Sequence, residues 1–156
     1  MNPSTHIRIA TKEDLDQVKI NELAIGAGVI ENKIELGEVI VADDGGKITG
    51  ILRFSWFWDF LPFINYIWVE EGFRHKHRAS RMIRKLEEIT VGKNHQTIMT
   101  STQADESAQN FYRKVGFEDA GGFTMQGQAF ELIMIKYIHK GQNQEVRPTF
   151  SVGSDS

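Results

Sequence analysis

The sequence predicts a single mixed α/β domain with a mostly antiparallel central sheet of about seven strands, flanked by about four helices. Three observations lead to this fold class. The length of 156 residues suits one domain. The composition, 40% apolar and 25% charged, is that of an ordinary globular protein. Finally, segments of alternating hydrophobicity are interrupted by segments of helical period, in the order strand, helices, three strands, helix, strand, helix, two strands.

The first half of the chain supplies hairpins. Residues 6–10 alternate as a strand, and Thr11 with Asp14 three residues later is typical of a helix start. The helix that follows is expected to break at residues 26–28, Gly-Ala-Gly. Further elements are expected as a short helical piece at 31–36, strands at 39–42, 48–58 and 63–69, and a tight turn at 43–46.

The second half begins with the clearest helix. Apolar residues recur at helical spacing from Ala79 to Ile89, and a second helix is expected from Asp105, as its cap, to a stop at Gly116. Strands are expected at 97–101, 117–123 and 129–137, which makes a strand–helix–strand crossover. Residues 1–138 then form the domain, and residues 139–156 a polar, flexible tail.

Composition excludes several classes of protein and of site. Without Cys there are no disulfides, thiolate zinc sites or Cys nucleophile. No apolar run approaches the ~18 residues of a membrane helix, and the N-terminus has no secretion signal. The expected compartment is therefore the cytoplasm, and no membrane partner is expected.

Positive charge is concentrated in one place. Residues 74–85 carry six of the 18 basic residues and no acid, while the net charge of the chain is −3. A compact basic patch on an otherwise acidic protein indicates a local polyanion site. The patch begins where a strand passes into a helix, at residues 69–80, and free N–H groups at a helix N-terminus favour phosphate.

Two motifs in this region carry a resemblance to a known family. Val69 and Arg74, with Ala79 five residues later, match a loop of the form Val, four residues, Arg/Gln-x-x-Gly-x-Gly/Ala. Residues 105–117, Asp-Glu-Ser-Ala-Gln-Asn-Phe-Tyr-Arg-Lys-Val-Gly-Phe, match Asn-x-x-Ala-x-x-x-Tyr-x-x-x-Gly-Phe. With these motifs in this order, residues 6–138 resemble the GNAT superfamily of acyl-CoA-dependent N-acyltransferases.

The resemblance implies that acetyl-CoA is the cosubstrate, without a metal. It assigns the backbone before the loop to the pantetheine arm, with the Val69 N–H polarising the thioester carbonyl. Two positions depart from the family: His77 replaces the first loop Gly, and Asp105 replaces the Asn. The residues that the resemblance assigns to the cosubstrate are Ile67, Trp68, Val69, Arg74, His75, Lys76, His77, Arg78, Ala79, Ser80 and Asp105.

The resemblance also assigns the catalytic acid to Tyr112. A phenol with a pKa of ~10 protonates a departing thiolate while staying neutral at pH 7; the alternative role of Tyr112 is packing beside Phe111. The general base is not assigned. The two positions where family members carry a carboxylate hold Phe63 and Thr100, and the nearby acids Asp59, Glu70 and Glu71 are candidates that equally suit an ordinary surface.

Nine of the 16 aromatic residues lie at 54–73, and the Trp58–Phe60 tip is a candidate acceptor pocket or homodimer surface. The leading function is direct acetyl transfer from acetyl-CoA to a primary amine of a small molecule or peptide. One alternative is a non-catalytic acyl-CoA-binding regulatory module, because His77 replaces Gly and no base is evident. The other is a nucleic-acid-binding protein that uses residues 74–85, although no aromatic residues interleave with that run.

Overall fold

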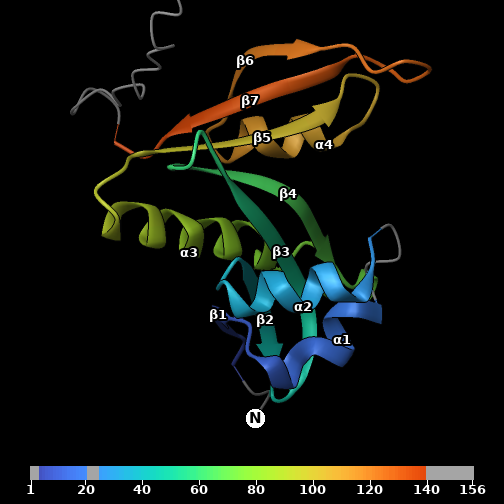
Figure 1. Ribbon diagram of the computed structural model, residues 1–156, viewed down its shortest axis with the longest axis vertical. Helices are drawn as coiled ribbons and strands as arrows, with labels where there is room; N and C mark the ends of the chain where they lie inside the picture. The colour runs from blue at the N-terminus through green and yellow to red at the C-terminus, as the bar shows by residue number, and fades with distance from the viewer. Residues whose placement is uncertain (1–3, 21–24, 140–156) are drawn as a thin grey trace, which may run out of the picture.

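Seven strands form one twisted sheet in the order β1-β2-β3-β4-β5-β7-β6 (Figure 1). The computed structural model describes residues 4–20 and 25–139, and the expected tail at 139–156 lies outside them except for its first residue. All neighbouring strands are antiparallel except β4 and β5. The strands are β1 (His6–Ile9), β2 (Val39–Asp44), β3 (Lys47–Phe57), β4 (Leu61–Val69), β5 (Thr97–Gln103), β6 (Glu118–Phe123) and β7 (Glu131–Tyr137). The expected fold class is confirmed.

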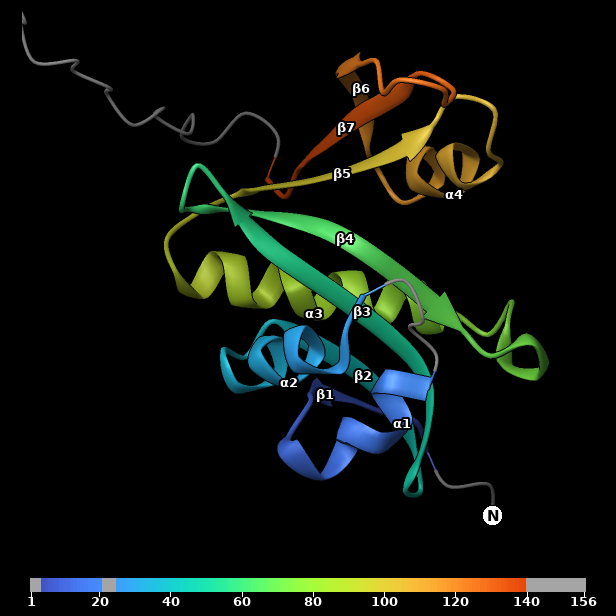
Figure 2. The same ribbon diagram turned by 45° about the vertical axis from the view of Figure 1, so that its right-hand side comes forward.

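Helices cover both faces of the sheet (Figure 2). On one face lie the 3₁₀ turn η1 (Lys12–Asp14), α1 (Leu15–Ile20) and α2 (Ala27–Glu35), which pack on β2 and β3 through a cluster that includes Val18, Ile30 and Val41. On the other face lie α3 (Arg78–Gly92) and α4 (Ala108–Lys114). The 3₁₀ turn η2 (Glu71–Phe73) connects β4 to α3. None of the helices in residues 4–20 and 25–139 is long and apolar enough to span a membrane.

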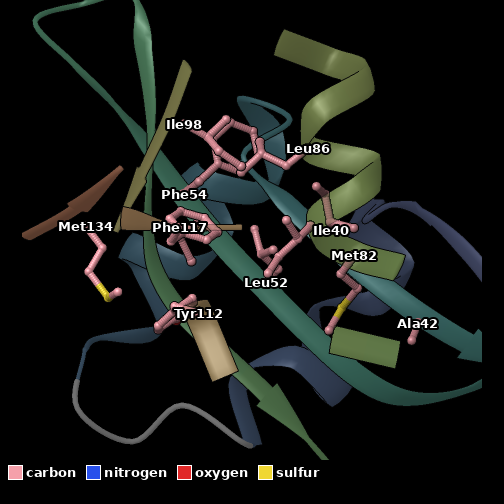
Figure 3. Packing of buried hydrophobic residues seen from close by; sticks show 12 residues of the cluster. Ile40, Ala42, Leu52, Phe54, Met82, Leu86, Ile98, Tyr112, Phe117 and Met134 are labelled. Atoms are coloured by element: carbon pink, nitrogen blue, oxygen red, sulfur yellow. The ribbon is translucent and has the colours of Figure 1, made fainter. Parts of the chain in front are cut away.

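The core under α3 is the larger of the two (Figure 3). Met82, Ile83 and Leu86 are at most 1% exposed and face Leu52 and Phe54 of β3, as the helical spacing predicts. Each such side chain contributes about 1.5–3 kcal/mol by leaving water. This burial fixes the direction of α3, and therefore the position of its N-terminus beside the end of β4.

Strands β4 and β5 pair only briefly and then diverge, which Figure 2 shows as a V that opens toward their C-terminal ends. The only paired residues are Phe63 with Met99 and Ile64 with Thr100. Asn65, the next residue of β4, has no counterpart on β3, because Ile64 pairs with Phe54 and Tyr66 with Arg53. Such a bulge bends its strand. The bend therefore begins at the last pair and leads residues 65–69 away from β5.

Three local predictions need correction. Residues 26–28 were expected to interrupt a helix, but α2 begins at Ala27, with Gly26 as N-cap. Burial of Ile30 and Ile34 on one face outweighs the cost of about 1 kcal/mol for Gly28 inside a helix. Asp43 and Asp44 belong to β2, not to the turn, and the expected cap Asp105 precedes the actual N-cap, Ser107. Residues 21–24, where the first expected helix continues, lie outside the described residues.

The aromatic hairpin tip lies far from the mouth of the V. Trp58 and Asp59 take left-handed backbone angles (φ 55° and 70°), and Trp58 is 39% exposed. The ring of Phe60 stacks near Trp58 and contacts His95 after α3. Phe60 is nine residues from Val69, or roughly 30 Å along an extended strand. The tip thus lies away from the end of β4, and its expected role as an acceptor pocket or a homodimer surface stays a prediction.

Candidate active site at the end of β4

Two histidines of the loop between β4 and α3 take a backbone conformation that favours glycine. His75 and His77 both lie in the left-handed region, with φ of 62° and 64°. For a residue with a side chain this conformation costs about 1–2 kcal/mol, because Cβ approaches the backbone, whereas Gly has no Cβ and no such cost. His77 is the N-cap of α3, and its carbonyl accepts hydrogen bonds from the Arg81 N–H (2.9 Å) and the Ser80 hydroxyl (3.0 Å). His77 therefore holds a backbone conformation that glycine, the residue of the family motif at this position, adopts without strain.

A cavity of about 520 Å³ opens beside this loop, between the N-terminus of α3 and the helix α4. Its lining contains Arg, Lys and His side chains but, among the described residues, no Asp or Glu. The backbone N–H groups of the first turn of α3 lack partners within the helix, so the helix end adds partial positive charge. The lining residues are Val69, Phe73, Arg74, His75, His77, Arg78, Ala79, Ser80, Phe111, Lys114 and Val115.

Most of the sequence-predicted cosubstrate residues meet at this cavity. Val69 and six residues of the loop and α3 line it, whereas Ile67, Trp68, Lys76 and Asp105 do not. Ile67 and Trp68 lie on the diverging part of β4, where Ile67 packs toward α3 and Trp68 toward the α1–α2 face. Asp105 is exposed in the turn between β5 and α4. Their assignments to the cosubstrate remain predictions.

Sequence reasoning missed Phe73 as an organising residue. Three cationic groups lie over its ring: the Arg78 guanidinium at 4.7 Å, the Lys47 ammonium at 5.2 Å and the Lys76 ammonium at 5.8 Å from the centroid. Cations favour aromatic faces within about 6 Å. The phenyl ring thus gathers positive charge directly before the loop, although nothing in the motif marks Phe73.

The two arginines of the loop motif have different environments. Arg74 is exposed, and its Nε donates to the Val69 carbonyl over 3.0 Å, so its guanidinium lies against the end of β4. Arg78 is 7% exposed, and its guanidinium points instead into an ion pair with Asp44 (Nη2–Oδ1 2.8 Å). Its side chain is therefore committed to the protein, and Arg78 can offer a phosphate its backbone N–H.

Other basic side chains of residues 74–85 also have partners within the protein. Arg81 donates to the Thr5 carbonyl over 3.0 Å, and Lys85 lies 3.6 Å from Glu88. With Arg78, and with Arg74 at the Val69 carbonyl, four of the six cations have hydrogen-bond or ion-pair partners within the described chain. Of the six, Arg74 and Arg78 line the cavity, and no aromatic residues interleave with the run as stacking platforms for bases would, which favours a small phosphate ligand over a nucleic acid.

Tyr112 lies in the core at the point where β4 and β5 separate. Its side chain is 8% exposed and packs against Phe117, with ring centroids 5.3 Å apart. Burial raises its pKa above the ordinary value of a phenol, against the opposing effect of a hydrogen bond with Thr100. The hydroxyl therefore stays protonated at neutral pH, as a proton donor must. Both roles weighed from the sequence, packing and acid, fit this position.

From the sequence, Thr100 stands only where some family members carry a base. In the structure its hydroxyl donates to the Ile64 carbonyl over 3.1 Å, across the last β4–β5 pair, and it also bonds Tyr112. Two residues on, the Thr102 hydroxyl donates to Glu106 over 2.9 Å, and the charge of Glu106 further raises the Tyr112 pKa. The phenol thus has Thr100 as its hydrogen-bond partner and Glu106 nearby, in surroundings that are otherwise apolar. Among the described residues, no three His, Asp or Glu side chains could together hold a metal ion.

Replacing His77 with Gly is expected to raise the free energy of unfolding by up to about 1 kcal/mol, because the left-handed strain disappears while Gly adds some chain entropy. The affinity for CoA should stay the same or increase. Chemical denaturation and calorimetric titration would measure both. His77→Ala is the control, since it removes the imidazole but keeps Cβ, and it should give no gain in stability. Equal losses of CoA affinity in both variants would instead show that the imidazole itself binds phosphate.

Comparisons with known proteins bear on the fold and the family. A sequence model of the acetyltransferase (GNAT) family matches residues 11–117. A search of curated proteins found no match. A GNAT-family acetyltransferase from Bacillus cereus is 22% identical, with a TM-score of 0.73 and coverage of 86% of this chain and 97% of that one.

Two further structures of similar fold hold coenzyme A or acetyl-CoA. The PaiA N-acetyltransferase from Thermoplasma acidophilum, in complex with coenzyme A, is 15% identical (TM-score 0.71, covering 86% of this chain and 99% of that one). YncA from Salmonella typhimurium, with acetyl-CoA, is 13% identical (TM-score 0.72, covering 91% and 98%). At these identities the likeness establishes the fold.

Proposed function

The chain belongs to the acetyltransferase (GNAT) family, and on that premise we propose that it transfers the acetyl group of acetyl-CoA directly to a primary amine. The observation that carries the proposal is the cavity beside the phosphate-favouring loop, which Val69, the N-terminus of α3 and residues of α4 line. Tyr112 does not line this cavity but lies buried beside Phe111, which does. Neither a metal nor a covalent enzyme intermediate is needed, because amine and thioester react directly.

The loop, the cavity and the end of β4 suit two parts of the cosubstrate, the pyrophosphate and the pantetheine arm. The pyrophosphate would lie against the loop, with Arg74, His75, Lys76 and His77 around it and the N–H groups of Arg78, Ala79 and Ser80 as donors. The pantetheine arm would run along residues 67–69, whose edge toward β5 pairs with no strand within the described residues. Asp105, at the entry to α4, would contact the arm from the other side. The PaiA and YncA structures, which hold this cosubstrate on a similar fold, support the assignment.

The chemistry requires one polarising donor and one acid. The Val69 N–H would donate to the thioester carbonyl oxygen as negative charge develops there. The amine nitrogen forms the new C–N bond, the C–S bond breaks, and Tyr112 gives its proton to the departing sulfur. The proton lost by the ammonium passes to solvent or to a carboxylate through water, and it later restores the phenol.

The class of acceptor follows from the cost of deprotonating it. At pH 7 a lysine side chain costs about 4.6 kcal/mol to deprotonate, whereas an α-amine with a pKa of ~8 costs about 1.4 kcal/mol. Neither family position for a base holds a carboxylate here, since Phe63 and Thr100 occupy them. The site is therefore better suited to an amine of low pKa on a small molecule or peptide.

The alternative of a non-catalytic CoA-binding module rested on two features. His77 takes the left-handed conformation that favours Gly, which supports a working loop without the glycine. The missing base remains, but an amine of low pKa reduces the need for it. A protonated, buried Tyr112 at the base of the V favours the enzyme.

Calorimetric titration with CoA tests the cosubstrate assignment. The wild-type chain should bind one CoA, and Arg74→Ala should weaken binding by about 1–2 kcal/mol, because a charge-assisted phosphate contact is lost. Added salt should weaken it further. The control is Arg113→Ala, which removes an exposed arginine that pairs with Asp119 and does not line the cavity. Absence of binding at millimolar CoA would remove the cosubstrate from the proposal.

A further inference from the structure

Arg78 is the centre of a hydrogen-bond network that no motif predicts. Its Nη2 donates to Asp44 Oδ1 (2.8 Å) and to the Thr5 hydroxyl (3.0 Å), and its Nε contacts Asp44 Oδ2 (3.2 Å) and the Thr49 hydroxyl (3.1 Å). Thr5 and Thr49 in turn each donate to Asp44, Thr5 over 2.6 Å. Every member of this set, which we call the Arg78 network, is thus bonded to at least two others.

The Arg78 network joins four parts of the chain. Thr5 precedes β1, Asp44 ends β2, Thr49 lies in β3, and Arg78 is the first residue of α3. The side chains of Arg78 and Asp44 are only 8% and 11% exposed. An ion pair with this burial and full hydrogen bonding has well-defined geometry, unlike an exposed pair. The network therefore fixes the N-terminus of α3 against the edge of the sheet.

The network also acts on both ends of the phosphate loop. Arg78 directly follows His77, and its guanidinium lies 4.7 Å from the Phe73 ring centroid and donates to the Phe73 carbonyl (3.4 Å). Residues 74–77 are thus held between two fixed points. Left-handed conformations such as those of His75 and His77 persist only where the surroundings impose them.

We propose that the Arg78 network is a positioning device for the phosphate loop, and that Thr5 and Asp44 set the affinity for CoA without touching it. The inference rests on the proposed function, since it assigns CoA to the loop. Arg78 is accordingly a positioning residue, and the N-terminal segment takes part in cosubstrate binding through the hydroxyl of Thr5. Removing one member of the network loosens the loop. Binding of CoA must then order the loop, and this loss of entropy weakens the affinity.

The test measures the CoA dissociation constant of network variants by calorimetry, well below their melting temperatures. Asp44→Asn should raise it about 10-fold and Thr5→Val about 3-fold, within the range that indirect residues exert on a site. Thr5→Ser keeps the hydroxyl that Thr5→Val removes, and it should bind CoA as the wild type does. Thr49→Val and Thr49→Ser form a second pair with the same expectation.

The matched control is Asp14→Asn. Asp14 forms a comparable two-point pair with Arg8 (2.7 and 2.9 Å), and its side chain is 8% exposed, but it does not contact the loop. This variant should lose stability as Asp44→Asn does, yet keep the wild-type affinity for CoA. A fall in stability alone therefore cannot imitate the expected pattern.

The possible outcomes distinguish the positioning role of the Arg78 network from the assignment of CoA to the loop. If the wild type binds CoA while Asp44→Asn and Thr5→Val bind it equally well, the network is only structural and the inference fails alone. Equal weakening by Asp14→Asn also overturns it. If the wild type does not bind CoA, the cosubstrate assignment fails and the inference with it. Should Asp44→Asn not fold, the Thr5→Val and Thr5→Ser pair decides by itself.

Discussion

Replacing Tyr112 with Phe is expected to lower kcat by about 10²–10⁴-fold, the usual contribution of a positioned proton donor. The substitution removes one hydroxyl and leaves the ring packed against Phe117. Affinity for acetyl-CoA should change much less, because the phenol acts on the sulfur mainly as that atom gains charge. Steady-state kinetics with an amine that the wild-type chain acetylates, together with a CoA titration, measure the two effects separately.

The control for this prediction is Tyr137→Phe, since Tyr137 lies at the far end of β7 and is 46% exposed. It should keep wild-type kinetics. The Tyr112→Phe chain also loses the hydrogen bond to Thr100, so its melting temperature must be measured alongside. If it keeps more than about half of the wild-type kcat while chemistry is rate-limiting, Tyr112 serves packing only and the sulfur leaves without it.

The second large effect concerns stability. Arg78→Ala is expected to lower the free energy of unfolding by about 3 kcal/mol at neutral pH, because it leaves the Asp44 carboxylate buried without its cation. The exposed pair of Arg113 and Asp119, whose side chains are 40% and 53% exposed, supplies the control. Arg113→Ala should cost less than about 1 kcal/mol. Urea denaturation at pH 7 measures both variants.

The loss should depend on pH in a defined direction. The guanidinium of Arg78 holds the pKa of Asp44 well below its usual range. A carboxyl whose pKa is lower in the folded state stabilises the protein above its unfolded pKa of ~3.9, and this stabilisation is lost as the pH falls toward the folded value. The gap between wild type and Arg78→Ala should therefore narrow below about pH 4. A gap no larger than that of Arg113→Ala at pH 7 would contradict the assigned role of the pair.

Periodicity and turn chemistry predicted most elements of the fold in their order along the chain. The spacing of Met82, Ile83 and Leu86 predicted the buried face of α3, and Thr11 with Asp14 predicted a capped start, in which the Thr11 N–H donates to Asp14 (2.8 Å). The start of α2 was missed, because Gly28 opposes a helix locally and only the burial of Ile30 and Ile34 outweighs it. That burial depends on residues distant in the sequence.

The candidate site was predictable where backbone conformation follows from the motif. The position of Arg74, His77 and Ala79 around a helix N-terminus is local, and the cavity forms there. The direction of the Arg78 side chain is not local, because Asp44 and Thr5 lie 34 and 73 residues away along the chain. For the same reason no sequence signal marks Thr100 as the hydrogen-bond partner of Tyr112. Thr100 lies opposite Ile64 in the last β4–β5 pair.

The measurement that tests the central claim most directly is acetyl transfer itself. Purified chain would be incubated with acetyl-CoA and a panel of amino acids, peptide N-termini, polyamines and lysine side chains, with mass spectrometry of the amines and titration of free CoA thiol. We predict one acetylated amine per thiol released, with α-amines or other amines of low pKa preferred, and near-complete loss in Tyr112→Phe. Tight binding of acetyl-CoA with no acetylated amine in any class would contradict the enzyme and favour the binding module.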